Sequence, residues 1–288
     1  MKLVVVPSNL DNLDKYIESG CEGFIFGLEN YSINYLGLSI DKIKSLVDKY
    51  KDIDIFISVN KTIFNSELKD LEEKLIELNK IGIKGVLFYD LGVLSLYKKH
   101  KFSYSLGWHQ THMVTNYNTC NYYFDKGVEY GVLASEITCS EMIEIKKNTS
   151  MKLFTFILGH PVMAHSRRRL LTNYYASQNR EYDNSLKKIS EHDKEYIVTD
   201  NDDGTCIYEG DIINGTSYIF ELSSCGIEYG IIHGFNIDDR LLERLILLTK
   251  KVIDNNSSAA LEEIKTLIGN NTGFFDKKTI FKVKKDEK

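Results

Sequence analysis

Short strand-like runs alternate with amphipathic helical stretches along most of this chain, and this alternation limits the folds that it can adopt. Seven runs rich in β-branched and aromatic residues precede residue 159, and an eighth begins at Tyr229. Between the runs lie helical patterns such as Ser66–Gly82, which places Leu68, Leu71 and Leu75 on one face and ends at a glycine. Strands that alternate with helices pair in parallel through right-handed crossovers.

Eight strand–helix units favour a TIM-type (β/α)8 barrel over the alternative, a doubly wound open sheet. The count is eight, and no glycine-rich dinucleotide fingerprint follows the first run. We expect one barrel domain over residues 1–288, with an insertion at 159–226 between the seventh and eighth strands. The insertion is predicted to hold a basic segment, a β-hairpin that turns at Asp203–Gly204, and a short helix. The tail, 268–288, is predicted to add a peripheral strand before a charged end.

Composition excludes several classes of protein. The formal net charge of -5 argues against a dedicated nucleic-acid-coating protein, although it leaves room for a local basic patch. No stretch approaches the roughly 20 apolar residues of a membrane span, and the N-terminal apolar run is too short for a signal peptide. We therefore expect a cytoplasmic protein. Its five cysteines lack metal-site spacing, so they are interpreted as core residues and no metal ligand is predicted.

The chemistry of a (β/α)8 barrel lies at the C-terminal ends of its strands. Polar or aromatic residues stand at these positions in every predicted unit: Ser8, Glu29, Asn60, Asp90, Trp108, His109, Glu136, His160 and His233. Asp90, Glu136 and His160 are candidate acids or bases. Asn60, His109 and Asn116 are candidate ligand-binding residues. The alternative for each single residue is a helix cap or a solvated loop position.

The segment GHPVMAHSRRRLLTNYY, residues 159–175, concentrates positive charge in an acidic chain. Three adjacent arginines, Arg167, Arg168 and Arg169, cannot share one helix face. Because the guanidinium fork matches carboxylate and phosphate oxygens, anion binding is the favoured interpretation, and structural ion pairing is the alternative. Tyr174 and Tyr175 are interpreted as core or interface residues rather than base-stacking platforms.

The chain resembles peptidase family U32 over nearly its whole length. Blocks that look like those of the family, in family order, include GFIFGLENYS, ISVNKTIFNSEL, IKGVLFYDLGVL, YGVLASEITCSEMIEI and FILGHPVMAHSRRRLLTNY. Phe156, Gly159 and Thr172 fit the family signature. Its two cysteine positions fall on Val162 and Arg169, whereas in cysteine-bearing members those thiolates help to hold a [4Fe–4S] cluster. The resemblance therefore implies a short, cluster-free branch with no cofactor in this chain.

The family resemblance implies two kinds of function. Some members take part in oxygen-independent hydroxylation, including that of wobble uridine in tRNA, with prephenate as the implied oxygen source. The leading hypothesis is an auxiliary or substrate-binding component of such a system, paired with a longer cluster-bearing relative and in contact with tRNA. The alternative is a collagenase-like peptidase that acts alone, although neither a nucleophile elbow nor a zinc-protease motif is present. A small-molecule-binding barrel of another purpose is a third hypothesis, and whether the chain is an enzyme stays open.

Overall fold

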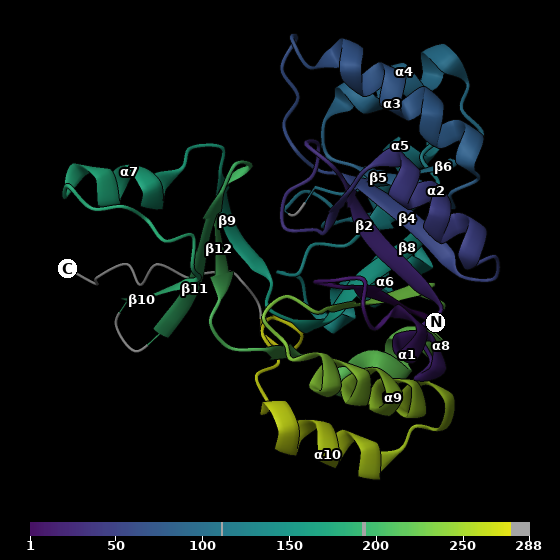
Figure 1. Cartoon of the computed structure of the whole chain (residues 1–288). Coiled ribbons are helices and arrows are strands. Elements are labelled where there is room, and N and C mark those ends of the chain that lie inside the picture. The colour runs from purple at the N-terminus through teal and green to yellow at the C-terminus, as the bar shows by residue number, and fades with distance from the viewer. Residues whose placement is uncertain (111, 192–193, 278–288) are drawn as a thin grey trace, which may run out of the picture.

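Eight parallel strands close into a barrel, as the alternation of strand and helix patterns predicts (Figure 1). The computed structural model describes residues 1–110, 112–191 and 194–277. The barrel strands are β1 (Lys2–Val6), β2 (Gly23–Leu28), β4 (Asp54–Val59), β5 (Gly85–Phe88), β6 (Ser105–Trp108), β7 (Tyr130–Val132), β8 (Lys152–Gly159) and β14 (Tyr229–His233). Strand β1 pairs with both β2 and β14, which closes the ring. The predicted TIM-type barrel is therefore confirmed.

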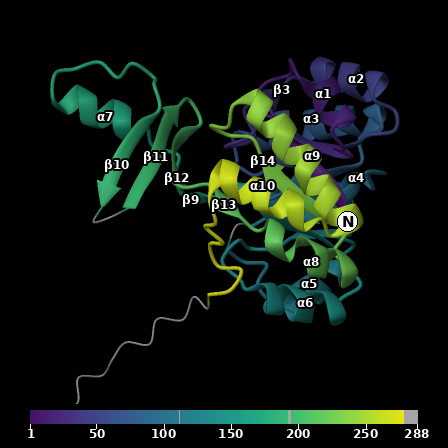
Figure 2. The ribbon, with the colours of Figure 1, turned by 90° about the horizontal axis from the view of Figure 1, so that it is seen from below.

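A helix follows each barrel strand, and the helices surround the ring (Figures 1 and 2). They are α1 (Leu13–Glu18), α2 (Ile40–Lys49), α3 (Leu68–Ile81), α4 (Leu91–His100), α5 (Tyr117–Asp125), α6 (Cys139–Lys147), α8 (Ile219–Ser224) and α9 (Asp239–Asn255). A further helix, α10 (Ser258–Ile268), packs on α9, and a two-residue strand, β3 (Gly37–Leu38), extends the sheet beside β2. None of the described helices has the length and apolar character needed to cross a membrane.

Aromatic rings fill the inside of the barrel. Phe56 of β4 is fully buried, and its ring centroid lies 5.0 Å from that of Phe154, 5.4 Å from that of Tyr229 and 5.5 Å from that of Tyr130. Edge-to-face contacts of this kind add to the free energy gained from burying the rings. The barrel is therefore a packed core rather than a channel, and a ligand can enter only at its ends.

The insertion between β8 and β14 builds a second, antiparallel sheet that we call the arm, residues 160–210. It contains β9 (Val162–Ser166), α7 (Leu170–Ser177), β10 (Lys187–Glu191), β11 (Lys194–Asn201) and β12 (Gly204–Glu209), in the sheet order β10-β11-β12-β9. The predicted hairpin is confirmed, because β11 and β12 pair in antiparallel fashion up to Asn201 and Gly204. Glycine is required at 204, where φ is +121° and a Cβ atom would lie 2.0 Å from the carbonyl oxygen of Ser166.

The short helix expected in the insertion belongs to the ring rather than to the arm. Helix α8, preceded by a 3₁₀ turn (Thr216–Tyr218) and the short strand β13 (Ile213–Asn214), packs against α6 and α9. Its apolar residues Ile219 and Leu222 are fully buried. The amphipathic pattern identified a helix correctly, but a single sequence does not say which surface such a helix covers.

The C-terminal segment returns to the barrel. Phe275 is 6% exposed, its ring stacks on Tyr218 with centroids 5.2 Å apart, and its carbonyl accepts a hydrogen bond from the backbone N–H of Cys139. Residues 269–277 of the tail form no strand, and the rest of the tail in which a strand was expected lies outside the described ranges.

The Phe56→Ala substitution tests the aromatic core. It removes a fully buried ring that touches three others, so the free energy of unfolding should fall by about 3–5 kcal/mol. Urea denaturation followed by circular dichroism measures the change. Phe124→Ala on α5, where the ring is 41% exposed, is the matched control and should change stability by less than about 0.5 kcal/mol. Equal losses in the two variants would contradict the packing described here.

Candidate functional site at the barrel mouth

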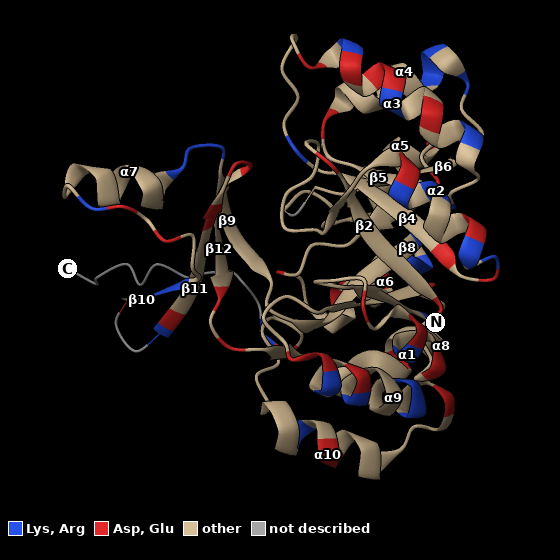
Figure 3. Ribbon diagram, viewed as in Figure 1, with Lys and Arg blue, Asp and Glu red and all other residues tan. Residues whose placement is uncertain are grey.

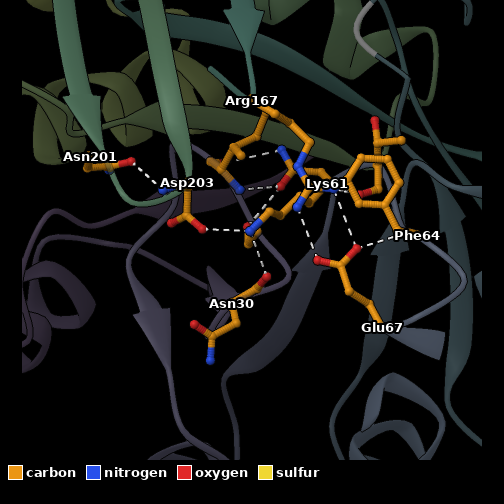
Figure 4. A network of polar contacts seen from close by, with 11 residues as sticks. Asn30, Lys61, Phe64, Glu67, Arg167, Asn201 and Asp203 are labelled. Atoms are coloured by element: carbon orange, nitrogen blue, oxygen red, sulfur yellow. Dashed lines mark hydrogen bonds and ion pairs between the residues drawn. The ribbon is translucent and has the colours of Figure 1, made fainter. Parts of the chain in front are cut away.

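The arm lies against the carboxyl end of the barrel, and a buried lysine joins the two. Lys61 directly follows Asn60 at the end of β4 and is 7% exposed. Its Nζ donates to the carbonyl oxygen of Asn30 at 3.0 Å and pairs with Asp203 Oδ1, in the β11–β12 turn, at 2.9 Å (Figure 4). Since a buried ammonium is stable only when it is paired, this contact holds the arm to the mouth.

Arg167 makes a second connection from arm to barrel (Figure 4). Its guanidinium donates to both carboxylate oxygens of Glu67, at 3.1 and 3.4 Å, and to the carbonyl oxygen of Thr62 at 3.0 Å. The same group lies 4.1 Å from the centroid of the Phe64 ring. Although partial burial acts to raise the pKa of Glu67, hydrogen bonds from the Phe64 N–H and from Arg167 hold it below its ordinary value. We call Lys61, Glu67, Arg167 and Asp203 the latch.

Two cavities lie where the arm meets the mouth. The first, about 220 Å³, is lined by Ile33, Asn34, Asn60, Thr62, Tyr89, His109, Gln110, His112 and residues 162–165 of β9. The second, about 380 Å³, lies between the ends of β1 and β14 and the β11–β12 hairpin, and it includes Ser8, Tyr35, Tyr208 and His233. Both cavities have one wall from the barrel and one from the arm, so neither exists without the insertion.

Uncharged imidazoles and one tyrosine surround the top of the barrel core. The Tyr35 ring lies edge-on to His109 and to His233, with centroid distances of 6.0 and 5.8 Å. Burial lowers the pKa of His109 and of His233 to about 4 each, so both rings are neutral at pH 7. His109 Nδ1 is buried, and no hydrogen-bond partner is found for it among the described residues. His233 is also buried, and a hydrogen bond with the backbone of Asn34 acts to raise its pKa against the larger effect of burial. Buried nitrogens of this kind are ready to bind a ligand that carries hydrogen-bond donors or acceptors.

Three of the predicted site residues have structural contacts. Asp90 caps α4 by accepting from the Gly92 N–H at 2.8 Å, and it accepts from the Ile63 N–H at 3.2 Å. Asn116 caps α5 through the Thr119 N–H. Asn60 lines the first cavity, and its amide binds the 32–34 loop through Ser32, Ile33 and Asn34. The contacts of Asp90 are therefore those of a helix cap, which was the alternative to a catalytic role.

The remaining candidate acids and bases, His160 and Glu136, have different surroundings. His160 is 4% exposed and its Nδ1 donates to the carbonyl oxygen of Glu209, while burial lowers its pKa. Glu136 pairs with His112 at 3.3 Å and lines a third cavity of about 410 Å³, beside β8 and the C-terminal segment. Neither Asp90 nor Glu136 lines the two cavities at the mouth. The structure does not bring the three candidates into one cluster.

The three adjacent arginines have different surroundings. Arg167 belongs to the latch, Arg169 pairs with the exposed Asp202 at 3.2 Å, and Arg168 is exposed. Of the two places expected for Tyr174, core or interface, the core is wrong, because its side chain is 62% exposed on α7, and the interface stays a prediction. Tyr175 is only half-buried. The three guanidinium groups therefore do not form a single clamp in this structure.

Sequence reasoning missed most of the latch and, at the centre of the mouth, Tyr35. Lys61 follows a strand end by one residue and could have been singled out by that position. Asp203 was identified only as a turn residue. Glu67 lies 100 residues before its partner Arg167, and no pattern within one sequence links them. Tyr35 belongs to the loop between β2 and β3, which has no periodicity to mark it.

The cysteines do not form a metal site. Cys21, Cys120, Cys139 and Cys206 are buried, and burial raises the pKa of each thiol. Within the described ranges, no group of three or more His, Cys, Asp or Glu side chains is arranged to hold a metal ion. Val162 lies in β9 and Arg169 occupies the N-cap position of α7 without a capping hydrogen bond from its side chain, so the two positions at which the resemblance implies cysteines belong to the arm.

Comparison with known proteins gives consistent results. The model of peptidase family U32 matches residues 8–278. The tRNA hydroxylation protein P2 of Bacillus subtilis (strain 168) is 27% identical, and the alignment covers 97% of this chain and 99% of that protein. The tRNA hydroxylation protein P1 of the same organism is 22% identical over 62% of this chain and only 43% of its own length. A relative from Helicobacter pylori (strain J99 / ATCC 700824), tRNA hydroxylation protein P, is 27% identical over 71% of this chain and 50% of its own length.

A solved structure supports the fold. The U32 peptidase Mk0906 superposes with a TM-score of 0.53 at 12% identity, covering 81% of this chain and 92% of that one. The likeness concerns the fold alone.

The His233→Gln substitution tests the neutral imidazoles of the mouth. The folded protein holds the pKa of His233 near 4 and the unfolded chain near 6.5, so between these values the unfolded state binds more protons. His233 should therefore contribute a loss of stability of about 1.4 kcal/mol for each pH unit below 6.5, down to about pH 4. Urea denaturation at pH 7.5, 6 and 5 should show the stability difference between wild type and variant shrinking toward low pH. A difference independent of pH would contradict the assignment.

Proposed function

Because the chain belongs to peptidase family U32, and because one relative matches it from end to end, we propose that it is a component of a tRNA hydroxylation system. The observation that carries the proposal is the alignment with tRNA hydroxylation protein P2, which leaves almost no part of either protein unmatched. A tRNA substrate implies that the chain works in the cytoplasm.

The finer part of the proposal concerns a partner. In Bacillus subtilis one tRNA hydroxylation protein is aligned over 99% of its length and another over 43%. The second protein therefore has sequence beyond the part that this chain matches. We infer that this chain pairs with such a longer family member and acts as its auxiliary or substrate-binding component.

The cysteines of this chain support the inference that the partner carries the cluster. The cluster implied for cysteine-bearing relatives needs several thiolates close together. Here the family positions hold Val162 and Arg169, and the described residues contain no group of three or more His, Cys, Asp or Glu side chains that could hold a metal ion. These residues do not fit an iron–sulfur cluster, so we assign no redox step to this chain and place that chemistry on the partner.

The barrel mouth is the proposed place for a small oxygen-donating ligand, with prephenate as the candidate that the resemblance implies. The mouth offers neutral imidazoles and amides, which can hydrogen-bond to carboxylate oxygens without carrying a full positive charge. The arginine that lies nearest in the sequence to β9, Arg167, is held by Glu67. Binding of a dicarboxylate is therefore expected to be weak in the isolated chain and to strengthen if a partner supplies cations. The contacts that Asp90 and Glu136 make give no support to the peptidase alternative.

Deletion of the gene for this chain tests the proposed function. Mass spectrometry of tRNA nucleosides should show less hydroxylated uridine than in the parent strain, and a plasmid copy should restore it. The parent strain and the deletion strain with an empty plasmid are the controls. An unchanged nucleoside profile in the deletion strain would reject the proposal.

Pairing is tested separately from function. The tagged chain should co-purify with the longer family member from cells grown without oxygen. Lack of co-purification, together with loss of hydroxylated uridine on deletion, would keep the role in tRNA hydroxylation and reject the stable pairing.

A further inference from the structure

The far end of the arm carries exposed aromatic and basic side chains that nothing in the barrel uses. Helix α7 projects away from the barrel in both views (Figures 1 and 2), and none of its residues is buried. Tyr174 is 62% exposed and Leu170 is 45% exposed. A helix with no buried face gains little from packing within its own chain, so its residues are available to another molecule.

Tyr175 is the centre of a cluster at this end of the arm. Its ring centroid lies 5.8 Å from that of Tyr174 and 5.5 Å from that of Tyr182. The Arg180 guanidinium lies 5.1 Å from the Tyr175 centroid, and the Lys187 ammonium lies 5.7 Å from the centroids of both Tyr175 and Tyr182. We call these five residues, together with Arg168, the tip patch.

The segment that carries most of the tip patch is locally basic. Residues 167–180 contain four arginines and no aspartate or glutamate, although the whole chain has a net charge of -5. Arg168 is exposed, and no ion pair or hydrogen bond to its side chain is found within the described ranges. Nearby carboxylates neutralise two other cations, since Asp183 pairs with Lys187 and Asp202 pairs with Arg169. Arg168, before the start of α7, and Arg180, after its end, therefore remain as exposed positive groups. Figure 3 shows basic segments of the chain at both ends of this helix.

We propose that the tip patch binds an RNA loop, with its tyrosine rings stacking on unpaired bases and its arginines contacting phosphates. This inference rests on the proposed function, because it names the surface through which a tRNA would be held. Rings beside cations are the arrangement that unpaired bases and their phosphates require, because every base has a face that can stack. The absence of carboxylates between 167 and 180 complements a polyanion.

The position of the tip patch suggests a function for the part of the arm that lies away from the latch. Only two residues separate the latch residue Arg167 from the start of α7, so this helix begins near the latch and projects from there away from the barrel (Figures 1 and 2). An RNA held along α7 therefore has the barrel mouth near one end of that helix. Two sites on one rigid body recognise a folded RNA better than either site alone.

Fluorescence anisotropy with the full chain tests the surface directly. The probes are a labelled anticodon stem–loop RNA and a labelled duplex of the same stem without the loop. The wild type should bind the stem–loop more tightly than the duplex. Tyr174→Ala/Tyr175→Ala should weaken stem–loop binding by about tenfold or more, as expected for lost base stacking. Arg168→Ala/Arg180→Ala should lower the slope of log Kd against log salt by about 1.4, or about 0.7 for each lost phosphate contact.

A matched control is available on the barrel. Tyr122 on α5 is 59% exposed, and the ammonium of Lys126 lies 5.3 Å from its ring centroid. Tyr122→Ala/Lys126→Ala removes the same chemistry from another surface and should leave RNA binding unchanged. Thermal unfolding of every variant checks that the fold is intact, and no large change is expected because the replaced side chains are exposed or half-buried.

The outcomes separate this inference from the proposed function. Equal stem–loop binding by wild type and both tip variants, or no RNA binding by the wild type, would overturn the tip patch, while the nucleoside profile of the deletion strain would still judge the role in tRNA hydroxylation. Loss of the longer family member from purifications of the tip variants, with RNA binding unchanged, would identify the patch as a protein interface instead. Weaker stem–loop binding by the tip variants together with an unchanged profile on deletion would support the patch and reject the role.

Discussion

The pairing of buried Lys61 with Asp203 is the interaction on which the rest of the site depends. A charged ammonium removed from water requires a partner, and the loss of one member of such a pair commonly costs about 3–5 kcal/mol. Lys61 has its two partners in different parts of the molecule, the Asn30 carbonyl of the barrel and the Asp203 carboxylate of the arm. The arm must therefore remain at the mouth for the lysine to stay satisfied. Arg167 of the arm also pairs with a barrel residue, Glu67, but this ion pair is partly exposed.

This constraint makes the mouth a composite site. The barrel supplies His109, His233 and Tyr35, and the arm supplies the wall made by β9 and the β11–β12 hairpin. Burial is the reason that the histidines are neutral, because desolvation disfavours their charged form.

The sequence predicts the barrel better than the site, because strands and helices depend on neighbouring residues and the site depends on contacts between distant ones. Strand and helix periods are local, so the eight units and the hairpin at Asp203–Gly204 can be read from neighbouring residues. Strand-end polarity directed attention to Asn60, His109 and His233, which line the two cavities at the mouth, but it cannot separate a helix cap such as Asp90 from a ligand-binding group. The run of three arginines gave a stronger signal than its structure supports as one clamp, because charge density in a sequence does not show the direction of each side chain. Pairings over long separations, such as Arg167 with Glu67, depend on the complete fold.

The distance between the arm and the barrel tests the central claim that the latch holds them as one body. Spin labels at Gln178→Cys beside α7 and Lys69→Cys on α3, in a chain in which the half-buried Cys225 is replaced by serine, report this distance by pulsed electron paramagnetic resonance. The account predicts one narrow distance distribution for the labelled protein and a broad one after Lys61→Met, which leaves Asp203 without its partner. A broad distribution with Lys61 present, or a narrow one that Lys61→Met does not change, would contradict it.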